Sequence, residues 1–265
     1  MIKLQDNSFE NDASIKFILN NLPTIIQQAY VLEEKISHKI FTDIEAMIHN
    51  SENSIVLELD WQTTIWEISA KFEFRELWFT PQSWIHPKAD EKHSNILHSY
   101  AFFKLTHYDR GYNYNPNEEF QINNNRFPTS NFFRHDQGYM TIQFFLNYNL
   151  IRGLSFQYED LTKEASDLRV YREMCDWNEF RKNTLMQYKK LEDKGFELEG
   201  HGTFFEMKID LLDSELFIKE YEQGKLDKTL EPIEKVLKKV NESFDIFDDI
   251  QNKAKEYYLD LEQIN

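Results

Sequence analysis

The stretch TIWEISAKFEFRELWF, residues 64–79, alternates apolar and polar side chains along most of its length. Its apolar members are Trp66, Ile68, Ala70, Phe72 and Phe74, and the residues between them are Glu67, Ser69, Lys71, Glu73 and Arg75. A period of two places the two sets on opposite faces of a strand. Such alternation is typical of an antiparallel sheet with one covered and one wet face. We therefore predict an antiparallel sheet and place this stretch in it.

Other segments with strand-like patterns surround this one. Residues 54–61 predict a preceding strand, with a turn over Asp60 to Thr63, and residues 98–108 and 138–148 predict two more. In the last of these, Met140, Ile142, Phe144 and Leu146 share one face. Residues 195–212, GFELEGHGTFFEMKIDLL, predict a hairpin that reverses at Gly200-His201-Gly202. Together these segments give about six strands in a meander-like order.

Helical periodicity marks the two ends and the centre of the chain. The first fifty residues repeat apolar positions at steps of three and four, including Ile25, Ile36, Ile40, Ile44 and Ile48. Residues 159–194 and 230–258 show the same periodicity, and a shorter helix is predicted after Asp213. We predict one α+β domain over residues 1–265, which divides into a helical segment (1–52), a β-rich sheet (53–158) and a helix–hairpin–helix part (159–265).

The composition limits the classes of function. The chain has 265 residues, of which 41% are hydrophobic, and a formal net charge of -16. Binding to nucleic acid normally needs Lys and Arg to displace counterions, so neither a nucleic-acid partner nor an anionic membrane is expected. An acidic surface attracts a basic protein, although acidity also serves solubility alone. The single cysteine, Cys175, is interpreted as a small buried hydrophobe. Neither a signal peptide nor a membrane span is expected, and a cytoplasmic location is the default.

The predicted hairpin carries the candidate catalytic residues. Glu206 and Lys208 would point to the same side of one strand, and Glu197 or Glu199 of the other strand would lie close to Glu206. Carboxylates of this kind can hold Mg²⁺, and the lysine can stabilise an attacking water. The pattern resembles the acid-acid-x-lysine core of restriction-type endonucleases over these eighteen residues, but the usual first acid is an Asp further upstream. A cross-strand ion pair produces the same sequence, so the metal-bound site stays an alternative.

Histidines form a weaker candidate cluster. His86, His93, His98 and His107 fall within a short span, and His135 and Asp136 follow a long loop. Imidazoles can bind zinc or transfer protons, but no pair has the helical spacing of a metalloprotease. The sequence also lacks a G-x-S-x-G elbow, a P-loop and a G-x-G-x-x-G motif. No cofactor is therefore expected, with Mg²⁺ as the alternative.

Two further groups of residues are candidates for binding a protein. The long loop 109–138 is rich in Asn and aromatic residues, and rigid rings and Arg are enriched at interfaces; the same rings could instead roof the core. Acids outnumber bases by twenty to eleven in residues 190–265, and four of them, Glu242, Asp245, Asp248 and Asp249, cluster on or near one side of the last predicted helix. The candidate binding residues are Tyr112, Tyr114, Phe120, Phe127, Phe132, Phe133, Arg134, Asp245, Asp248 and Asp249.

These observations favour a non-catalytic, acidic protein that binds and sequesters a basic partner, as immunity proteins and inhibitors of defence systems do. A metal-dependent nuclease or phosphodiesterase built on Glu197, Glu199, Glu206 and Lys208 is the first alternative. A structural subunit of a larger complex is the second. The sequence does not indicate an oligomeric state.

Overall fold

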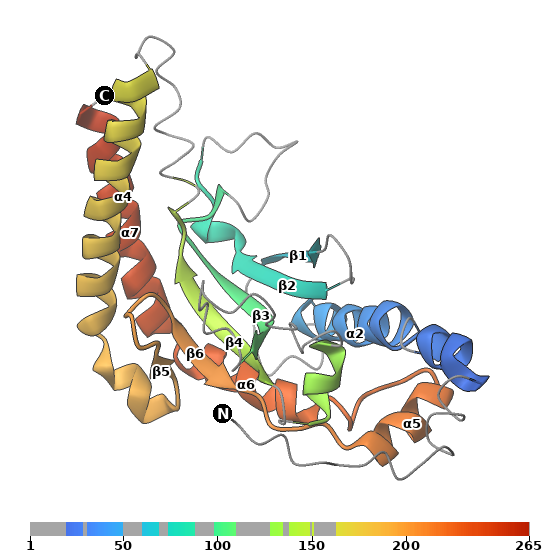
Figure 1. Cartoon of the computed structure of the whole chain (residues 1–265). Helices are drawn as coiled ribbons and strands as arrows, with labels where there is room; N and C mark the ends of the chain where they lie inside the picture. The colour runs from blue at the N-terminus through green and yellow to red at the C-terminus, as the bar shows by residue number, and fades with distance from the viewer. Residues whose placement is uncertain are drawn as a thin grey trace, which may run out of the picture.

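The computed structural model describes residues 20–28, 31–49, 60–68, 74–87, 98–109, 128–134, 138–148, 150 and 163–264. Six antiparallel strands form one sheet in the order β1-β2-β3-β4-β6-β5 (Figure 1). The strands are β1 (Trp61–Ile68), β2 (Phe74–Pro81), β3 (Ala101–Asp109), β4 (Gly138–Leu146), β5 (Glu197–Leu198) and β6 (Phe205–Lys208). The α+β class and the antiparallel sheet predicted from the sequence are confirmed.

The helices lie at the two ends of the described chain and around the sheet. Residues 20–28 are helical, and a π-helical turn (η1, Val31–Ile36) leads into α2 (Ser37–His49). The second half contains α4 (Lys163–Met186), α5 (Ser214–Glu222), α6 (Glu231–Glu242) and α7 (Phe244–Ile264). Short 3-10 turns occur at η2 (Gln82–Trp84), η4 (Pro128–Phe132) and η5 (Lys189–Lys194). Helices α4 and α7 run side by side as a long pair (Figure 1).

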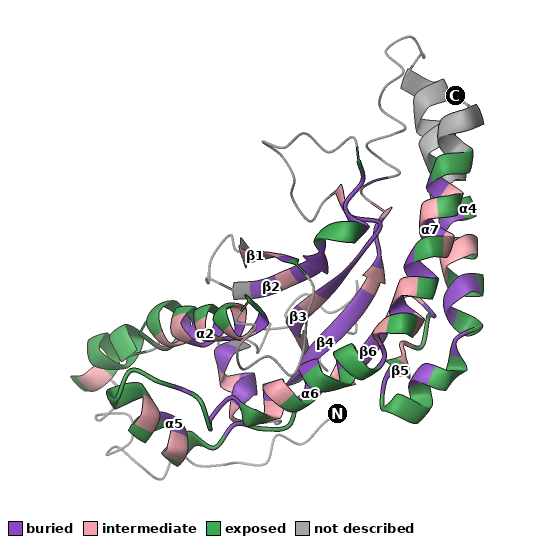
Figure 2. Cartoon of the chain, turned by 180° about the vertical axis from the view of Figure 1, so that it is seen from behind, coloured by how far each residue is buried: buried purple, intermediate pink, exposed green. Residues whose placement is uncertain are grey.

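One face of the sheet is covered by helices and holds the core. This apolar face is made of Leu77, Phe79, Phe103, Leu105, Ile142, Phe144 and Phe205, all buried (Figure 2). The ring of Phe247 on α7 lies 5.0 Å from the ring of Phe103 and 4.6 Å from that of Phe144. Helix α2 packs against β1 and β2 and buries Ile40, Ile44 and Ile48. The aromatic contacts explain why a chain rich in Phe folds around a single core.

The opposite, polar face is defined by the strand register. One row across five strands consists of Trp78, Lys104, Gln143, Glu206 and Glu197, each opposite the next. A neighbouring row contains Thr106, Thr141 and Lys208. Side chains at alternate positions of a strand share a face, so the predicted parity of residues 138–148 and 205–208 is confirmed.

The first hairpin differs from its prediction. The turn expected over Asp60 to Thr63 is wrong, because Trp61 to Ile68 form β1. The single long strand expected over residues 64–79 is two strands, β1 and β2, with residues 69–73 between them outside the described part. The sequence misled here because apolar alternation continues through the segment between the strands, without the Gly, Asn or Pro that usually marks a turn. Most of the strand expected over residues 54–61 also lies outside the described residues.

Three helical predictions need correction. The long helix expected over residues 230–258 is divided at Ser243 into α6 and α7, and Ser243 donates its backbone N–H to carbonyls of the last turn of α6. Cys175 on α4 is exposed, so the prediction that it is buried is wrong. Ile25, placed by its spacing on a buried stripe, is exposed. Helical spacing shows which residues share a face, but it does not show whether another element covers that face.

Candidate functional site

The β5–β6 hairpin forms as the sequence predicts and joins the edge of β4. Glu197 lies opposite Glu206, and Leu198 lies opposite Phe205. The reversal is closed by the backbone N–H of Gly202, which donates to the Glu199 carbonyl at 2.6 Å. Gly202 has a φ of +70°, a conformation that costs a residue with a Cβ. The hairpin therefore places Glu197, Glu206 and Lys208 on the polar face of the sheet.

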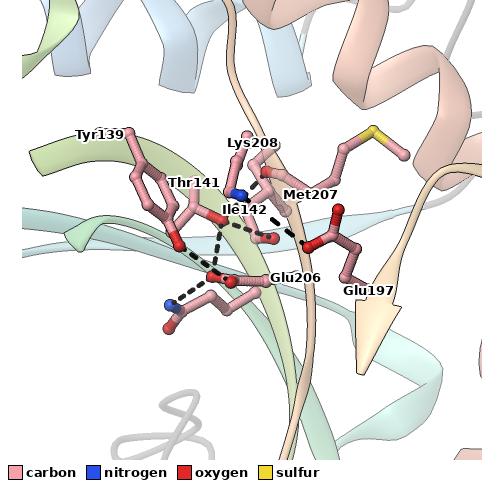
Figure 3. A network of polar contacts seen from close by, with 8 residues as sticks. Tyr139, Thr141, Ile142, Glu197, Glu206, Met207 and Lys208 are labelled. Carbon is pink, nitrogen blue, oxygen red and sulfur yellow. Dashed lines mark hydrogen bonds and ion pairs between the residues drawn. The ribbon is translucent and has the colours of Figure 1, made fainter. Parts of the chain in front are cut away.

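Glu206 is buried, with 8% of its surface exposed, although its strand position predicted a wet side chain. Its carboxylate accepts a hydrogen bond from the hydroxyl of Tyr139 at 3.0 Å (Figure 3). The hydroxyl of Thr141 lies 3.3 Å from the second carboxylate oxygen and 3.0 Å from the carbonyl of Met207, and its single proton can be donated to only one of them at a time. The amide Nε2 of Gln143 lies at the limit of bonding distance, 3.5 Å from the same carboxylate. Both carboxylate oxygens thus lie near polar groups of β4, as a buried polar side chain requires.

Lys208 is directed to Glu197 and to an aromatic ring. Its Nζ lies 3.8 Å from a carboxylate oxygen of Glu197, and both side chains are largely exposed. The same Nζ stands 4.9 Å from the centre of the Tyr139 ring, within range of a cation–π contact. Figure 3 shows Lys208 beside Glu197, with Glu206 bound to Tyr139 and Thr141. The cross-strand ion pair that the sequence left open is therefore present.

Glu199 belongs to the turn. Its carboxylate accepts hydrogen bonds from the backbone N–H of His201 and the hydroxyl of Thr203, both at 2.9 Å. Burial lowers the pKa of Arg181 on α4, and the negative charge of Glu199 acts in the opposite direction. Glu199 therefore stabilises the reversal and the contact with α4. Of the two acids proposed to join Glu206, the structure places Glu197 opposite it and uses Glu199 in the turn.

A second buried carboxylate on the polar face was missed by sequence reasoning. Glu76 of β2, with 3% of its surface exposed, accepts hydrogen bonds from the Thr106 hydroxyl at 2.7 Å and the Trp78 indole at 2.9 Å. Lys104 lies 2.8 Å from it and also stands over the rings of Trp78 and Phe145. The sequence feature that could have indicated its burial is the position of Glu76 beside apolar residues in β2. Its partners on another strand, however, cannot be inferred from the pattern of β2 alone.

The polar face can hold charge in an ordered network. Glu76 and Glu206 are each surrounded by donors from neighbouring strands, which orient the carboxylates and fix the rotamers of their partners. Their oxygens face protein donors, whereas a metal ion would need them as ligands. Within the described ranges, no group of three or more His, Cys, Asp or Glu side chains is placed to hold a metal ion.

The aromatic loop falls largely outside the described residues. Tyr112, Tyr114, Phe120 and Phe127 lie there, as do His93, His135 and Asp136. The structure shows the end of the loop, where Phe132 is 1% exposed and packs edge-on against Phe41 of α2 at 5.8 Å. Phe133 is half-buried against Phe217 of α5, and Arg134 is exposed. Phe132 therefore roofs the core, which was the alternative role for these rings.

The acids of α7 point in different directions. Asp248 accepts a hydrogen bond from the indole of Trp84 at 2.8 Å, and Asp249 accepts one from the hydroxyl of Tyr188 at 2.7 Å. Burial and this bond to Asp249 raise the pKa of Tyr188 well above its ordinary value. Asp245 is exposed. Asp248 thus ties α7 to η2, whereas Asp249 and Asp245 lie on the exposed side of the helix.

An acidic stripe emerges on α7 when its exposed residues are taken together. Asp245, Asp249, Glu256 and Asp260 are spaced by four, seven and four residues, which places them on one side of the helix. The opposite side is buried through Phe247, Ile250, Ala254 and Tyr258. Among the described residues, none of the four stripe carboxylates forms an ion pair with a Lys or Arg. The stripe is therefore an acidic surface, with Lys253 of the same helix beside it, over the ring of Tyr188 that binds Asp249.

The chain matches no family model, no curated protein and no solved structure. In the portion that the structure describes, no helix is both long and apolar enough to cross a bilayer. The candidate functional features are thus the hairpin network on the polar face and the acidic stripe on α7.

Proposed function

We propose that this protein is a non-catalytic, acidic binding protein that sequesters a basic protein partner. The observation that supports the proposal best is the acidic stripe, four exposed carboxylates on one side of α7 with no ion-pair partner among the described residues. The whole chain carries a formal net charge of -16, so the stripe lies in a field of the same sign. Complementary fields speed encounter and select partners of opposite charge.

Internal contacts support assigning no catalytic role to the hairpin. Glu206 is held by Tyr139 and Thr141, and Lys208 is paired with Glu197. A nuclease of the type that the Glu-x-Lys pattern resembles would need these groups to face a metal ion and a phosphate. In this protein the same groups join β4, β5 and β6, so the pattern has a sufficient structural explanation. Nothing in the described geometry favours a second function over the proposed one.

The proposal predicts binding that weakens as salt is raised. The purified protein would be immobilised to retrieve partners from a native lysate at low salt, and mass spectrometry would identify them. The retrieved partner would then be titrated at several salt concentrations. We expect a basic protein whose log Kd rises with log salt, because screening shortens the reach of exposed charges. A tight complex whose affinity is insensitive to salt would contradict the proposal.

A matched pair of variants separates the stripe from net charge. Glu256→Gln with Asp260→Asn removes two charges from the acidic stripe, and Glu222→Gln with Asp227→Asn removes two exposed charges near α5. We expect the first variant to bind roughly threefold to tenfold more weakly, as two exposed ion pairs allow, and the second to bind within about twofold of the wild type. Equal effects of the two variants would refute a role for the stripe.

A cleavage assay tests the nuclease alternative directly. Plasmid DNA and single-stranded RNA would be incubated with the protein and Mg²⁺, with Lys208→Ala as the comparison. We expect no cleavage by either protein. Cleavage by the wild type that disappears in Lys208→Ala would overturn the assignment.

A further inference from the structure

Strand β1 ends the sheet, and among the residues described no strand pairs with its outer edge. It is eight residues long, WQTTIWEI, and pairs with β2 one residue to one from Trp61 opposite Pro81 to Ile68 opposite Phe74. Natural sheets usually protect such edges with a lysine, a proline, a bulge or a very short strand. β1 contains a single charged residue, Glu67 near its end, but no lysine and no proline, and the uninterrupted register leaves no bulge. The other end of the sheet, β5, has two residues.

The register also shows which backbone groups face outward. The N–H of Gln82 donates to the carbonyl of Asp60 at 2.8 Å, and Pro81, opposite Trp61, has no N–H to donate. Hydrogen-bonded and non-bonded pairs alternate along an antiparallel ladder. The backbone of Gln62 and Thr64 therefore faces β2, whereas the N–H and C=O groups of Thr63 and Ile65 face the open edge. A strand added there would extend the sheet through these groups.

Charges beside the edge identify the chemistry of its occupant. Asp60, immediately before β1, is exposed. Glu45 of α2 is half-buried and accepts a hydrogen bond from the Thr63 hydroxyl at 2.6 Å. The same Thr63 hydroxyl lies 2.8 Å from Nε2 of His49. Carboxylates from two elements thus lie about the first half of the strand. They favour a cationic strand, and they disfavour a second copy of a chain with a net charge of -16.

We infer that β1 is a docking edge at which an extended, lysine- or arginine-rich segment of a basic protein adds a seventh, antiparallel strand. The inference rests on the proposed function, and it states how the basic partner binds. Main-chain hydrogen bonds to Thr63 and Ile65 supply affinity without regard to sequence, and the neighbouring carboxylates of Asp60 and Glu45 select positive side chains.

A labelled octapeptide of alternating lysine and valine residues tests the edge. Its controls are the same peptide N-methylated at alternate residues, which removes the edge hydrogen bonds, and an octapeptide of alternating glutamate and valine residues, which reverses the charge. Fluorescence anisotropy would measure each affinity. We expect saturable one-to-one binding of the first peptide, at least about tenfold weaker binding of the methylated peptide, the loss expected for two or more hydrogen bonds, and weaker binding of the glutamate peptide because its charge has the sign of the edge.

Two variants at one position separate backbone from side-chain effects. Thr63→Pro removes an outward N–H, and Thr63→Val keeps it, while both lose the bonds of Thr63 to Glu45 and His49. We expect Thr63→Val to bind the peptide like the wild type and Thr63→Pro to bind about tenfold more weakly. Amide exchange in the unaltered protein gives a second measurement in case the proline variant does not fold. The amides of Thr63 and Ile65 should exchange quickly in the free protein and slowly with peptide, whereas those of Gln62 and Thr64 should be protected in both states.

The outcomes distinguish this inference from the proposed function. In one outcome, binding is sensitive to salt, is unchanged by N-methylation of the peptide or by Thr63→Pro, and weakens in the stripe variant. This outcome would overturn the docking edge and leave the proposed function standing. No binding of any cationic peptide would overturn the docking edge, while retrieval of a basic partner from lysate would still support the proposed function. A dimer that dissociates in Thr63→Pro would show that a second copy occupies the edge and would also overturn the inference.

Discussion

The change Glu206→Gln tests whether the buried carboxylate is structural. Glutamine has nearly the shape of glutamate, so the variant removes the charge and one acceptor oxygen with little change in packing. In the wild type, the hydroxyl of Tyr139 donates to one oxygen of Glu206, and the hydroxyl of Thr141 is shared between the other oxygen and the Met207 carbonyl. In the variant, one of these hydroxyls meets an NH₂ group and must turn to accept from it.

The size of the effect follows from the hydrogen bonds. A bond to a charged group contributes about 1.5–3 kcal/mol, and a neutral one about 0.5–1.5 kcal/mol. Converting the charge-assisted bond from Tyr139 and the shared bond from Thr141 into neutral bonds, with the side chain still buried, gives an expected loss of about 1–3 kcal/mol. In a chain of this size such a loss lowers the melting temperature by roughly 2–10 °C.

Urea unfolding followed by circular dichroism and tryptophan fluorescence would measure the change. The midpoint should fall with an unchanged m-value, which shows that the surface exposed on unfolding is the same. Asp210→Asn, an exposed acid just beyond β6, is the charge-matched control and should stay within about 0.5 kcal/mol of the wild type.

A neutral or stabilising effect of Glu206→Gln would refute the structural interpretation. Residues kept for catalysis often reduce stability, and their replacement then stabilises the fold. If Mg²⁺ stabilised the wild type against urea but did not stabilise Glu206→Gln, Glu206 would have to be assigned to a metal site.

Three further changes test other parts of the structure. Burial and the bond to Asp249 raise the pKa of Tyr188 above 10.0 in the folded state. The stability that the neutral Tyr188 side chain contributes is therefore fully present below pH 10 and is lost as pH rises through the folded-state pKa. Above pH 10, the urea midpoint should fall less steeply with pH in Tyr188→Phe than in the wild type. Gly202→Ala should cost about 1–2 kcal/mol, because φ is +70° and the new Cβ would lie 3.1 Å from the Lys182 side chain, whereas Gly200→Ala, with open space around it, should melt close to the wild type. Asp213→Ala should cost about 1 kcal/mol in urea unfolding, because the Asp213 side chain caps α5 at the N–H groups of Glu215 and Leu216; a change below about 0.3 kcal/mol would contradict the cap.

Local patterns predicted the elements whose signals are complete within one segment. The hairpin at residues 195–212 has two alternating strands and a Gly-His-Gly reversal, and it forms with Glu206 and Lys208 on the side opposite Phe205. The cap at Asp213 likewise depends on neighbours along the chain. The first hairpin was misplaced because its reversal lacks a turn residue, and the break at Ser243 was missed because apolar spacing continues across it.

Whether a polar or aromatic side chain is buried depended on other segments. The alternation in its own strand predicts an exposed Glu206, but Tyr139 and Thr141 of β4 bury it. Phe132 reads as part of a polar loop, yet Phe41 of α2 covers it.

The sequence by itself determined the α+β class, the antiparallel sheet, the sign of the surface charge and the composition of the hairpin, because periodicity, turn residues and charge counts are properties of neighbouring residues. The tertiary structure decided that the Glu-x-Lys pair is held by β4 and β5, that the side of α7 opposite the stripe is buried, and that β1 is left at the edge of the sheet. These features are contacts between segments far apart in the chain, and a contact is set by the packing of both partners, which neither segment encodes alone.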